Sequence, residues 1–319
     1  MASITKLLSM KLSSTSKSVI LLILCTFFWG SCFPIGKHAL SEIHALTLVF
    51  WRFVIAAACL ALYLRLMRGQ PLSITRKQWL WVILVSAVGV GGLNLGLFTG
   101  LTYTSATNGS LIMALSPLIT SLIACLAQRT RPTFSQCFSL LVSLSGVLLV
   151  ITNGQLEILL SLTLNQGDKM IFVGMLAWSF YTYFSQGISR WMPVIPYTFV
   201  GMVSGAGVIG VMCLLTPDLN PITELFNSPA ISIIDVVYIG LFGTVAGYLL
   251  WLNGVRELGS STASLFFNFV PVFSVLTAFL LGQSVTQLQL VGIAVVILGL
   301  ILPRLMMLKR KPDTASQIA

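Results

Sequence analysis

The sequence predicts an all-α integral membrane protein, with ten transmembrane helices arranged as two inverted five-helix repeats and both termini in the cytoplasm. Three features predict this fold class: the composition, an internal repeat and the distribution of positive charge. Of 319 residues, 56% are hydrophobic and 8% are charged, and the mean hydropathy is +0.96. Because soluble domains carry about 25% charged residues, this chain is expected to lie in a bilayer.

The apolar residues fall into blocks of roughly 20, the length that a helix needs to cross a hydrocarbon core of about 30 Å. The connections between the blocks are short, so no separate soluble domain is expected. Lysines before the first block imitate a signal peptide, but the apolar run continues through Trp29 without a small-residue cleavage site, so this helix is expected to be retained. The predicted spans are residues 18–38, 45–67, 78–100, 105–127, 133–152, 168–189, 194–216, 231–254, 259–282 and 286–308.

The second half of the chain repeats the plan of the first. Pro117 and Pro271 lie 154 positions apart, as do Gly100 and Gly254. Self-similarity at half the chain length indicates a duplicated unit. The expected divisions are a cytoplasmic tail at 1–17, a first five-helix repeat at 18–152, an external linker at 153–167, a second five-helix repeat at 168–308 and a cytoplasmic tail at 309–319.

Positive charges predict the orientation. Of the 18 Lys and Arg residues, fifteen lie on one side of the predicted bundle, Lys37 and Lys169 lie on the other, and Arg52 lies inside a span. Since positively charged loops stay in the cytoplasm, the net charge of +10 indicates topology and no nucleic-acid partner is expected. The fifteen are Lys6, Lys11, Lys17, Arg65, Arg68, Arg76, Lys77, Arg129, Arg131, Arg190, Arg256, Arg304, Lys309, Arg310 and Lys311.

Five spans per repeat is an odd number, which requires the second repeat to enter the membrane upside down. The loop after the fourth span carries Arg129 and Arg131, whereas its counterpart at 282–287 is uncharged. Conversely, the turn at 102–106 is uncharged, whereas its counterpart carries Arg256. Similar helices with exchanged loop charges indicate an inverted-topology repeat.

Four features of the sequence carry a resemblance to a known family. They are Phe28-Trp29-Gly30 with Lys37, Arg52 in the second span, the run from Ala246 to Trp251, and Pro117 with Pro271 at equivalent repeat positions. On these residues the chain resembles the EamA-type branch of the drug/metabolite transporter superfamily over residues 18–308. It departs at Gln128 and Gln283, where the family usually has glutamate, so no role for those glutamates is carried over.

The resemblance implies a secondary transporter that moves small organic metabolites by alternating access, and specifically an exporter of amino acids or related compounds. The alternatives are a translocator of lipids or lipid-linked substrates and a membrane-embedded enzyme. The sequence contains no paired acids, activated nucleophile or phosphate-binding glycine motif, so we expect no enzyme and no cofactor. The expected partners are a small-molecule substrate and the lipid bilayer, in a monomer or homodimer in a bacterial cytoplasmic membrane.

Aromatic residues mark candidates for a substrate cavity. Trp29 and Trp178 occupy the centres of two equivalent spans, although membrane tryptophans usually lie at the interfaces. Tyr181 follows Trp178 by three positions, and Tyr248 with Trp251 repeats that spacing. Such faces fit a cavity for organic molecules, and they fit ordinary aromatic packing equally well.

Polar side chains within apolar runs are further cavity candidates. Asn268 follows Ser264 by four positions and precedes Pro271 by three, which gives a polar face beside a proline-weakened helix. Asn94 and Asn108 also interrupt apolar runs. For each amide, a hydrogen bond between helices is the alternative interpretation.

Arg52 is the permanent charge well inside a span, about 10 Å along the helix from Ala45 at 1.5 Å per residue. It can attract an anionic group such as a substrate carboxylate, or it can anchor backbone carbonyls near the external mouth. The structural role is favoured, because the resemblance places this arginine among general family features.

Other ionisable side chains suggest no metal site and no proton relay. His38 and His44 flank Glu42 in the first external loop, which is a weak pattern for metal ligands. Asp168 and Asp235 stand at the outer ends of their spans, where solvated helix caps are expected. The absence of a carboxylate from the span centres favours facilitated transport or exchange.

Overall fold

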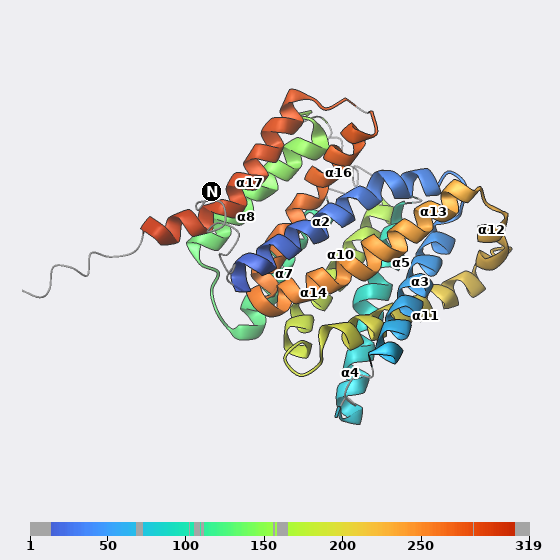
Figure 1. Cartoon of the computed structure of the whole chain (residues 1–319). Coiled ribbons are helices and arrows are strands. Elements are labelled where there is room, and N and C mark those ends of the chain that lie inside the picture. The colour runs from blue at the N-terminus through green and yellow to red at the C-terminus, as the bar shows by residue number, and fades with distance from the viewer. Residues whose placement is uncertain are drawn as a thin grey trace, which may run out of the picture.

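The computed structural model describes residues 14–67, 73–101, 103–104, 109, 112–155, 157, 165–282 and 284–309, and the regular elements among these residues are all helical (Figure 1). Two segments, η1 and η2, are π-helical, and η3 is a 3-10 turn. The elements are α2 (Ser14–Ala39), α3 (Ala45–Leu66), α4 (Arg76–Ser86), η1 (Ala87–Gly92), α5 (Leu93–Leu101), α7 (Ser116–Gln128), α8 (Phe134–Thr152), α10 (Gln166–Ile188), α11 (Val194–Leu215), α12 (Pro221–Asn227), α13 (Ala230–Tyr238), η2 (Ile239–Ala246), α14 (Gly247–Leu258), α15 (Ser260–Leu265), η3 (Phe266–Asn268), α16 (Phe269–Leu280) and α17 (Gln287–Lys309).

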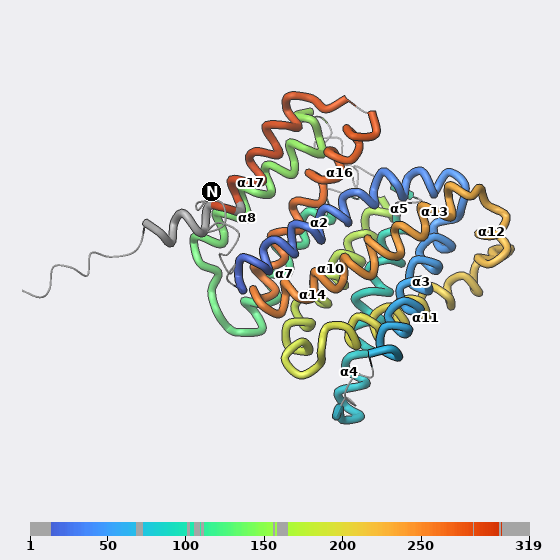
Figure 2. The backbone as a smooth tube through the Cα atoms, viewed as in Figure 1, coloured from blue at the N-terminus to red at the C-terminus, as the bar shows by residue number. Residues whose placement is uncertain are grey.

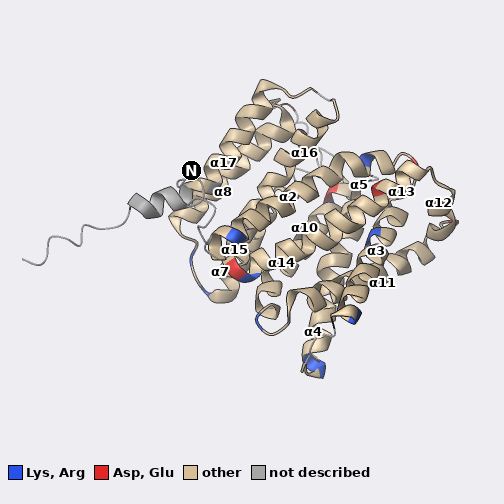
Figure 3. Cartoon of the chain, in the orientation of Figure 1, with Lys and Arg blue, Asp and Glu red and all other residues tan. Residues whose placement is uncertain are grey.

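Seven helices in the described part of the chain are long and apolar enough to cross a membrane, so the protein is a multi-pass membrane protein. Two shorter apolar helices add to these, at Ser116–Gln128 and Gln287–Gly299. Figure 3 shows helix bodies that are almost free of charged residues. The count of ten spans and the cytoplasmic location of both termini stay predictions. The seven are Ser14–Ala39, Ala45–Leu66, Arg76–Gly100, Phe134–Thr152, Val194–Leu215, Ala230–Leu258 and Ser260–Leu280.

The helix contacts follow the symmetry expected of two related halves. The contact of α2 with α14 corresponds to that of α10 with α5, and the contact of α2 with α16 corresponds to that of α10 with α7. Likewise α3 packs on η2 as α11 packs on η1, while the pairs α3–α11 and α8–α17 map onto themselves. This exchange pattern is what a two-fold relation between five-helix units produces.

Helices α8 and α17 form a pair at one end of the molecule, side by side in Figures 1 and 2. They share a small core that includes Val147 and Val296, distinct from the main core of the remaining helices. Glycines allow the close approach: a Cβ added to Gly146 would lie 2.6 Å from the backbone nitrogen of Val296. In lipid, where tails are as apolar as side chains, such small-residue contacts supply much of the helix association.

The two π-helical segments occupy equivalent places in the two halves. Gly92 ends η1 and Ala246 ends η2, and these positions are 154 apart, the spacing of the repeat. A wide π turn displaces carbonyls from regular pairing, and such turns recur at functional sites. Their presence in both halves was not predicted from the sequence.

Asp168 and Asp235 are less solvated than the sequence analysis expects. Asp168 completes a capping box with Asn165 as predicted for a cap, but it is only 3% exposed and its Oδ1 accepts a hydrogen bond from Thr104 at 2.6 Å. Asp235 lies 2.6 Å from Nδ1 of His38. The expectation of a solvated cap is therefore wrong for Asp168, which residues from a distant segment cover, whereas Asp235 lies inside α13 and its half-buried carboxylate pairs with His38.

Several predicted segments lie outside the described residues. These are residues 1–13 of the predicted tail, Asn108 with the other residues of 105–108, 110 and 111 in the predicted fourth span, Leu156 and residues 158–164 of the predicted linker, Gln283, and the chain beyond Lys309. The predicted domain boundaries stay predictions.

Candidate functional site

A cavity of about 380 Å³ lies between the two halves of the bundle. Five predicted site residues line it: Trp29 from α2, Arg52 from α3, Asn94 from α5, Trp178 from α10 and Tyr248 from α14. Trp29 and Tyr248, which are 219 positions apart in the sequence, thus line the same cavity. The volume is within the range of small-molecule sites.

Five aromatic rings, which we name the aromatic cluster, close the cavity toward the end of the bundle where α2 begins. Trp29 stands at their centre, and its ring centroid lies 5.4 Å from that of Trp178 and 5.2 Å from that of Trp251. Tyr248 and Phe267 each lie 5.9 Å from Trp29. Edge-to-face and tilted contacts of this kind hold the rings in place.

The indole of Trp29 is fixed by the π-helical segment η2. Its Nε1 donates a hydrogen bond to the carbonyl of Gly243 at 2.8 Å. The neighbouring Gly247 has to lack a side chain, because an added Cβ would lie 3.1 Å from Cδ1 of Trp29 and closer still to Nε1. The π turn therefore supplies the acceptor, and Gly247 at the start of α14 leaves the space that this indole occupies.

Arg52 is held against aromatic rings and faces the cavity. Its Cζ lies 5.1 Å from the ring centre of Phe53 and 6.0 Å from that of Phe98. Its Nε is buried without a hydrogen-bond partner, and in the part of the chain that the structure describes Arg52 takes part in no ion pair. Tyr248 interacts with both Arg52 and Asn94. Asn94 is buried and donates to the carbonyl of Val90 in η1 at 2.8 Å.

Asn268 lies at a second cavity of about 350 Å³ that adjoins the first. Its Nδ2 donates to Oγ of Ser143 on α8 at 2.9 Å, so the hydrogen bond between helices exists. Its Oδ1 is buried without a partner, and Asn268 and Pro271 both line the second cavity. Both interpretations of this amide are therefore compatible with its position. The residues shared by the two cavities are Phe33, Lys37, Met113, Phe267 and Val270.

Three predicted site residues lie behind the cavity wall. Trp251 is fully buried within the aromatic cluster, and Tyr181 stacks on Trp178 with ring centroids 5.6 Å apart. Ser264 is buried and donates to the carbonyl of Ser261 on its own helix at 2.9 Å. None of the three is among the described residues that line either cavity.

The two predicted helix-break prolines stand where the helices change. Pro117 lies in the first turn of α7, which begins at Ser116. Pro271 follows the 3-10 turn Phe266–Asn268. A proline lacks the N–H that would bond the carbonyl four residues earlier, which accounts for the irregular turn before Pro271.

Some lining residues were not predicted. Phe267 joins the aromatic cluster beside Asn268, and Gly243 supplies the carbonyl for Trp29. Cys32 and Met113 also line the cavity. The close spacing of Gly243 and Gly247 was the available signal, but helix packing explains such a pair equally well.

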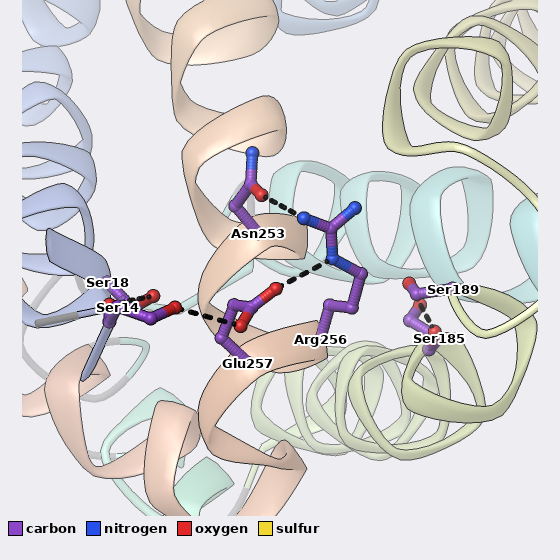
Figure 4. A network of polar contacts seen from close by, with 7 residues as sticks. All are labelled: Ser14, Ser18, Ser185, Ser189, Asn253, Arg256 and Glu257. Atoms are coloured by element: carbon purple, nitrogen blue, oxygen red, sulfur yellow. Dashed lines mark hydrogen bonds and ion pairs between the residues drawn. The ribbon is translucent and has the colours of Figure 1, made fainter.

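Polar contacts join α2 to α14 at the opposite end from the cavity (Figure 4). Oγ of Ser14 donates to Glu257 at 3.2 Å, and Glu257 pairs with Nε of Arg256 at 3.1 Å. Arg256 also donates to Oδ1 of Asn253 at 3.1 Å. Of these contacts, the one from Ser14 joins α2 to α14, and the other two lie within α14.

An apolar multi-pass bundle with a metabolite-sized cavity between two related halves is the architecture of a membrane transporter. The profile of the EamA-like transporter family matches this chain twice, over residues 16–152 and 165–304. The chain therefore belongs to the EamA-like transporter family, within the drug/metabolite transporter superfamily.

Individual relatives agree with this assignment. The chain is 33% identical over 282 residues to the uncharacterized transporter YyaM of Bacillus subtilis, covering 88% of this chain and 92% of that protein. It is 26% identical to a probable terminal-alkyne amino-acid exporter of Streptantibioticus cattleyicolor, covering 94% and 98%. A solved crystal structure shares the fold, with a TM-score of 0.75 at 17% identity over 93% of this chain and 99% of that one.

Proposed function

We propose that the protein is a secondary transporter that carries small organic metabolites across the membrane by alternating access. The observation that carries this proposal is the cavity of about 380 Å³ between the two halves, lined by Trp29, Trp178 and Tyr248 and open away from the aromatic cluster. Membership of a transporter family supports it.

The described conformation corresponds to an outward-facing state in this proposal. The cavity lining extends to Lys37 and Leu40 near the α2–α3 connection, which the charge distribution places outside. To open inward, the two halves have to rock so that the aromatic cluster parts and the hydrogen bond from Ser14 of α2 to Glu257 of α14 breaks.

Export of amino acids or related compounds is the finer part of the proposal. It is supported by the Streptantibioticus cattleyicolor relative, described as a probable terminal-alkyne amino-acid exporter. No Asp or Glu is among the described residues that line either cavity, so a proton-carrying carboxylate is not at hand there. Exchange or facilitated transport follows from that arrangement.

Counterflow tests the proposal. Proteoliposomes are preloaded with a mixed metabolite pool, and exchange is measured by mass spectrometry. We expect exchange of one chemical class, lost in Asn94→Leu and retained in Leu126→Ala, whose side chain is 77% exposed on the helix surface. Folded protein that exchanges no metabolite but moves lipid between leaflets would replace this proposal with lipid translocation.

A further inference from the structure

We propose that Arg52, Asn94 and Tyr248 form a carboxylate-binding subsite, and that the substrate is an organic anion with an apolar body. This inference rests on the proposed transport of small organic metabolites, and among amino acids and related compounds it selects derivatives whose amino group is uncharged. It differs from the structural role that the sequence analysis favours for Arg52.

Arg52 lacks the partners that a structural anchor would have. Neither a carboxylate nor a backbone carbonyl bonds its guanidinium within the described residues, and its Nε is buried without a hydrogen bond. A buried polar group without partners is costly, and it persists where a ligand completes it. The planar guanidinium is suited to a carboxylate, which it can bind through two parallel hydrogen bonds.

The fold does not require a cation at this place. The equivalent of α3 in the second half is α11, and α11 contains no Lys or Arg from Val194 to Leu215. Both helices pack against each other and against the π segment of the opposite half. The two helices pack equivalently, but the charged residue at this place is found in α3 alone. Helix packing therefore does not account for Arg52, and we attribute this arginine to the substrate that enters the cavity.

The cavity carries positive charge without compensation. Lys37 and Arg52 line it, and among its described lining residues there is no Asp or Glu. Low-dielectric walls focus the field of such charges into the cavity. An anion is therefore favoured over a cation, and over a zwitterion whose ammonium group would meet no carboxylate.

Two polar groups beside Arg52 complete the subsite. Tyr248 interacts with Arg52 and Asn94, and Asn94 is oriented by its hydrogen bond to the carbonyl of Val90. The guanidinium also lies within 6.0 Å of the ring centres of Phe53 and Phe98. Arg52, Asn94 and Tyr248 come from α3, α5 and α14, so three helices converge on one anionic group.

The remaining wall suits an apolar body. Trp29, Trp178 and Phe267 line the same cavity, and Leu93, Leu97 and Met113 add aliphatic surface to its lining. Aromatic faces take planar or aliphatic groups by burial of apolar surface. The class of substrate is a small carboxylate with an aromatic or aliphatic body, including amino-acid derivatives whose amino group is uncharged.

Matched probes test this inference. Purified protein is titrated by calorimetry with 3-phenylpropanoate, 3-phenylpropanamide and 3-phenylpropylamine, which share one body and differ in charge. We expect the acid to bind at least about tenfold more tightly than the amide, a ratio that corresponds to 1.4 kcal/mol. Hexanoate and hexanamide repeat the comparison with an aliphatic body, so that the result does not depend on the phenyl ring.

Variants assign the selectivity to the subsite. In Arg52→Met the acid should bind no better than the amide. Arg52→Lys keeps the positive charge but loses the paired N–H donors of the guanidinium, so it should retain part of the preference for the acid over the amide. Arg65→Met is the control, because Arg65 is an exposed arginine near the end of the same helix and should leave binding unchanged. If Arg52→Met does not fold, the test uses Tyr248→Phe and Asn94→Leu. Each of these variants should weaken the binding of the acid more than the binding of the amide.

The outcomes separate this inference from the proposed function. Equal binding of acid and amide by the unaltered protein, or failure of both acids to bind, overturns the carboxylate subsite. An unchanged preference in folded Arg52→Met overturns the role of Arg52. If neutral or zwitterionic metabolites are exchanged in proteoliposomes while the acids do not bind, the transporter proposal stands and the anion class is wrong.

Discussion

Trp29 links the cavity, the aromatic cluster and a π-helical turn. Its indole N–H donates to the carbonyl of Gly243, and its ring contacts Trp178, Trp251 and Tyr248. Cys32, one turn further along α2, faces the same π segment, where an added Cβ on Gly243 would meet its sulfur. A movement of η2 relative to α2 would therefore move the wall of the cavity.

Trp29→Phe removes the donor and retains most of the ring contacts. The carbonyl of Gly243 loses its partner, which we expect to lower the free energy of unfolding by about 1–3 kcal/mol. Thermal unfolding in detergent measures this change, and counterflow measures the accompanying loss of exchange. Trp191→Phe is the control, because Trp191 is 36% exposed in the connection between α10 and α11 and its substitution should change neither quantity.

Asn268 allows its two interpretations to be separated. Asn268→Leu removes an amide from the second cavity, and we expect exchange to fall while thermal stability stays near that of the unaltered protein. Ser143→Ala leaves Nδ2 of Asn268 without its partner and should cost about 1–3 kcal/mol of stability with exchange retained. Should both variants lose stability and keep exchange, the amide serves only to join the helices.

At the scale of elements, glycine contacts decide how closely the helices of the two halves approach. On α5, a Cβ added to Gly96 would lie 2.6 Å from the carbonyl oxygen of Met170 on α10. The facing Gly174 has no side chain either, so the two backbones lie against each other. This contact brings Asn94 and Trp178, from the same two helices, to one cavity.

Gly96→Ala should separate α5 from α10. Overpacking of a tight contact costs about 1–3 kcal/mol, and the added methyl group would meet backbone that cannot rotate away. A lower unfolding temperature is the expected result. The matched control is Gly207→Ala on α11, where an added Cβ would have no neighbour within 4 Å and should be neutral. Equal stability of the two variants would contradict the role assigned to this contact.

At the scale of the whole molecule, one end of the bundle is closed and the other is open to the cavity. The closed end holds the aromatic cluster and the contacts among Ser14, Arg256 and Glu257. The open end reaches Lys37, and there His38 of α2 pairs with Asp235 of α13. Which end faces the cytoplasm follows from the positive charges alone, so it requires a separate test.

Thiol labelling tests this orientation. In a background with the six native cysteines replaced by alanine, Lys37→Cys should react with a membrane-impermeant maleimide in intact cells. Arg190→Cys should react only after permeabilisation, because its exposed side chain lies in a predicted cytoplasmic loop. The reverse pattern would place both termini outside and make the described conformation inward-facing.

The positions of the spans were predictable from the sequence, because hydrophobicity is a local property of the chain. The predicted span 45–67 is found at Ala45–Leu66, and 133–152 at Phe134–Thr152. Their ends follow from local signals, since Thr133 forms a capping box that any reader of the sequence can recognise. The π segments were not predictable, because the sequence Ala87–Gly92 is compatible with an α-helix and only the neighbouring helices select the wider turn.

The candidate site was predictable in part. Trp29, Arg52, Asn94, Trp178 and Tyr248 line one cavity, whereas Trp251 and Ser264 do not. The polar or aromatic character of each residue is visible in the sequence. The side of the helix that faces the cavity depends on the rotation of that helix against its neighbours, which local spacing leaves undetermined.

The sequence by itself determined that this protein lies in a membrane, that its two halves are repeats and that it belongs to a transporter family. These properties depend on composition, on spacing and on similarity, all of which are local or additive along the chain. Only the tertiary structure decided which side chains share the cavity, that His38 meets Asp235, and that Arg52 lacks an acidic partner among the described residues. Such contacts join residues about 200 or more positions apart, and they depend on how whole helices approach and rotate.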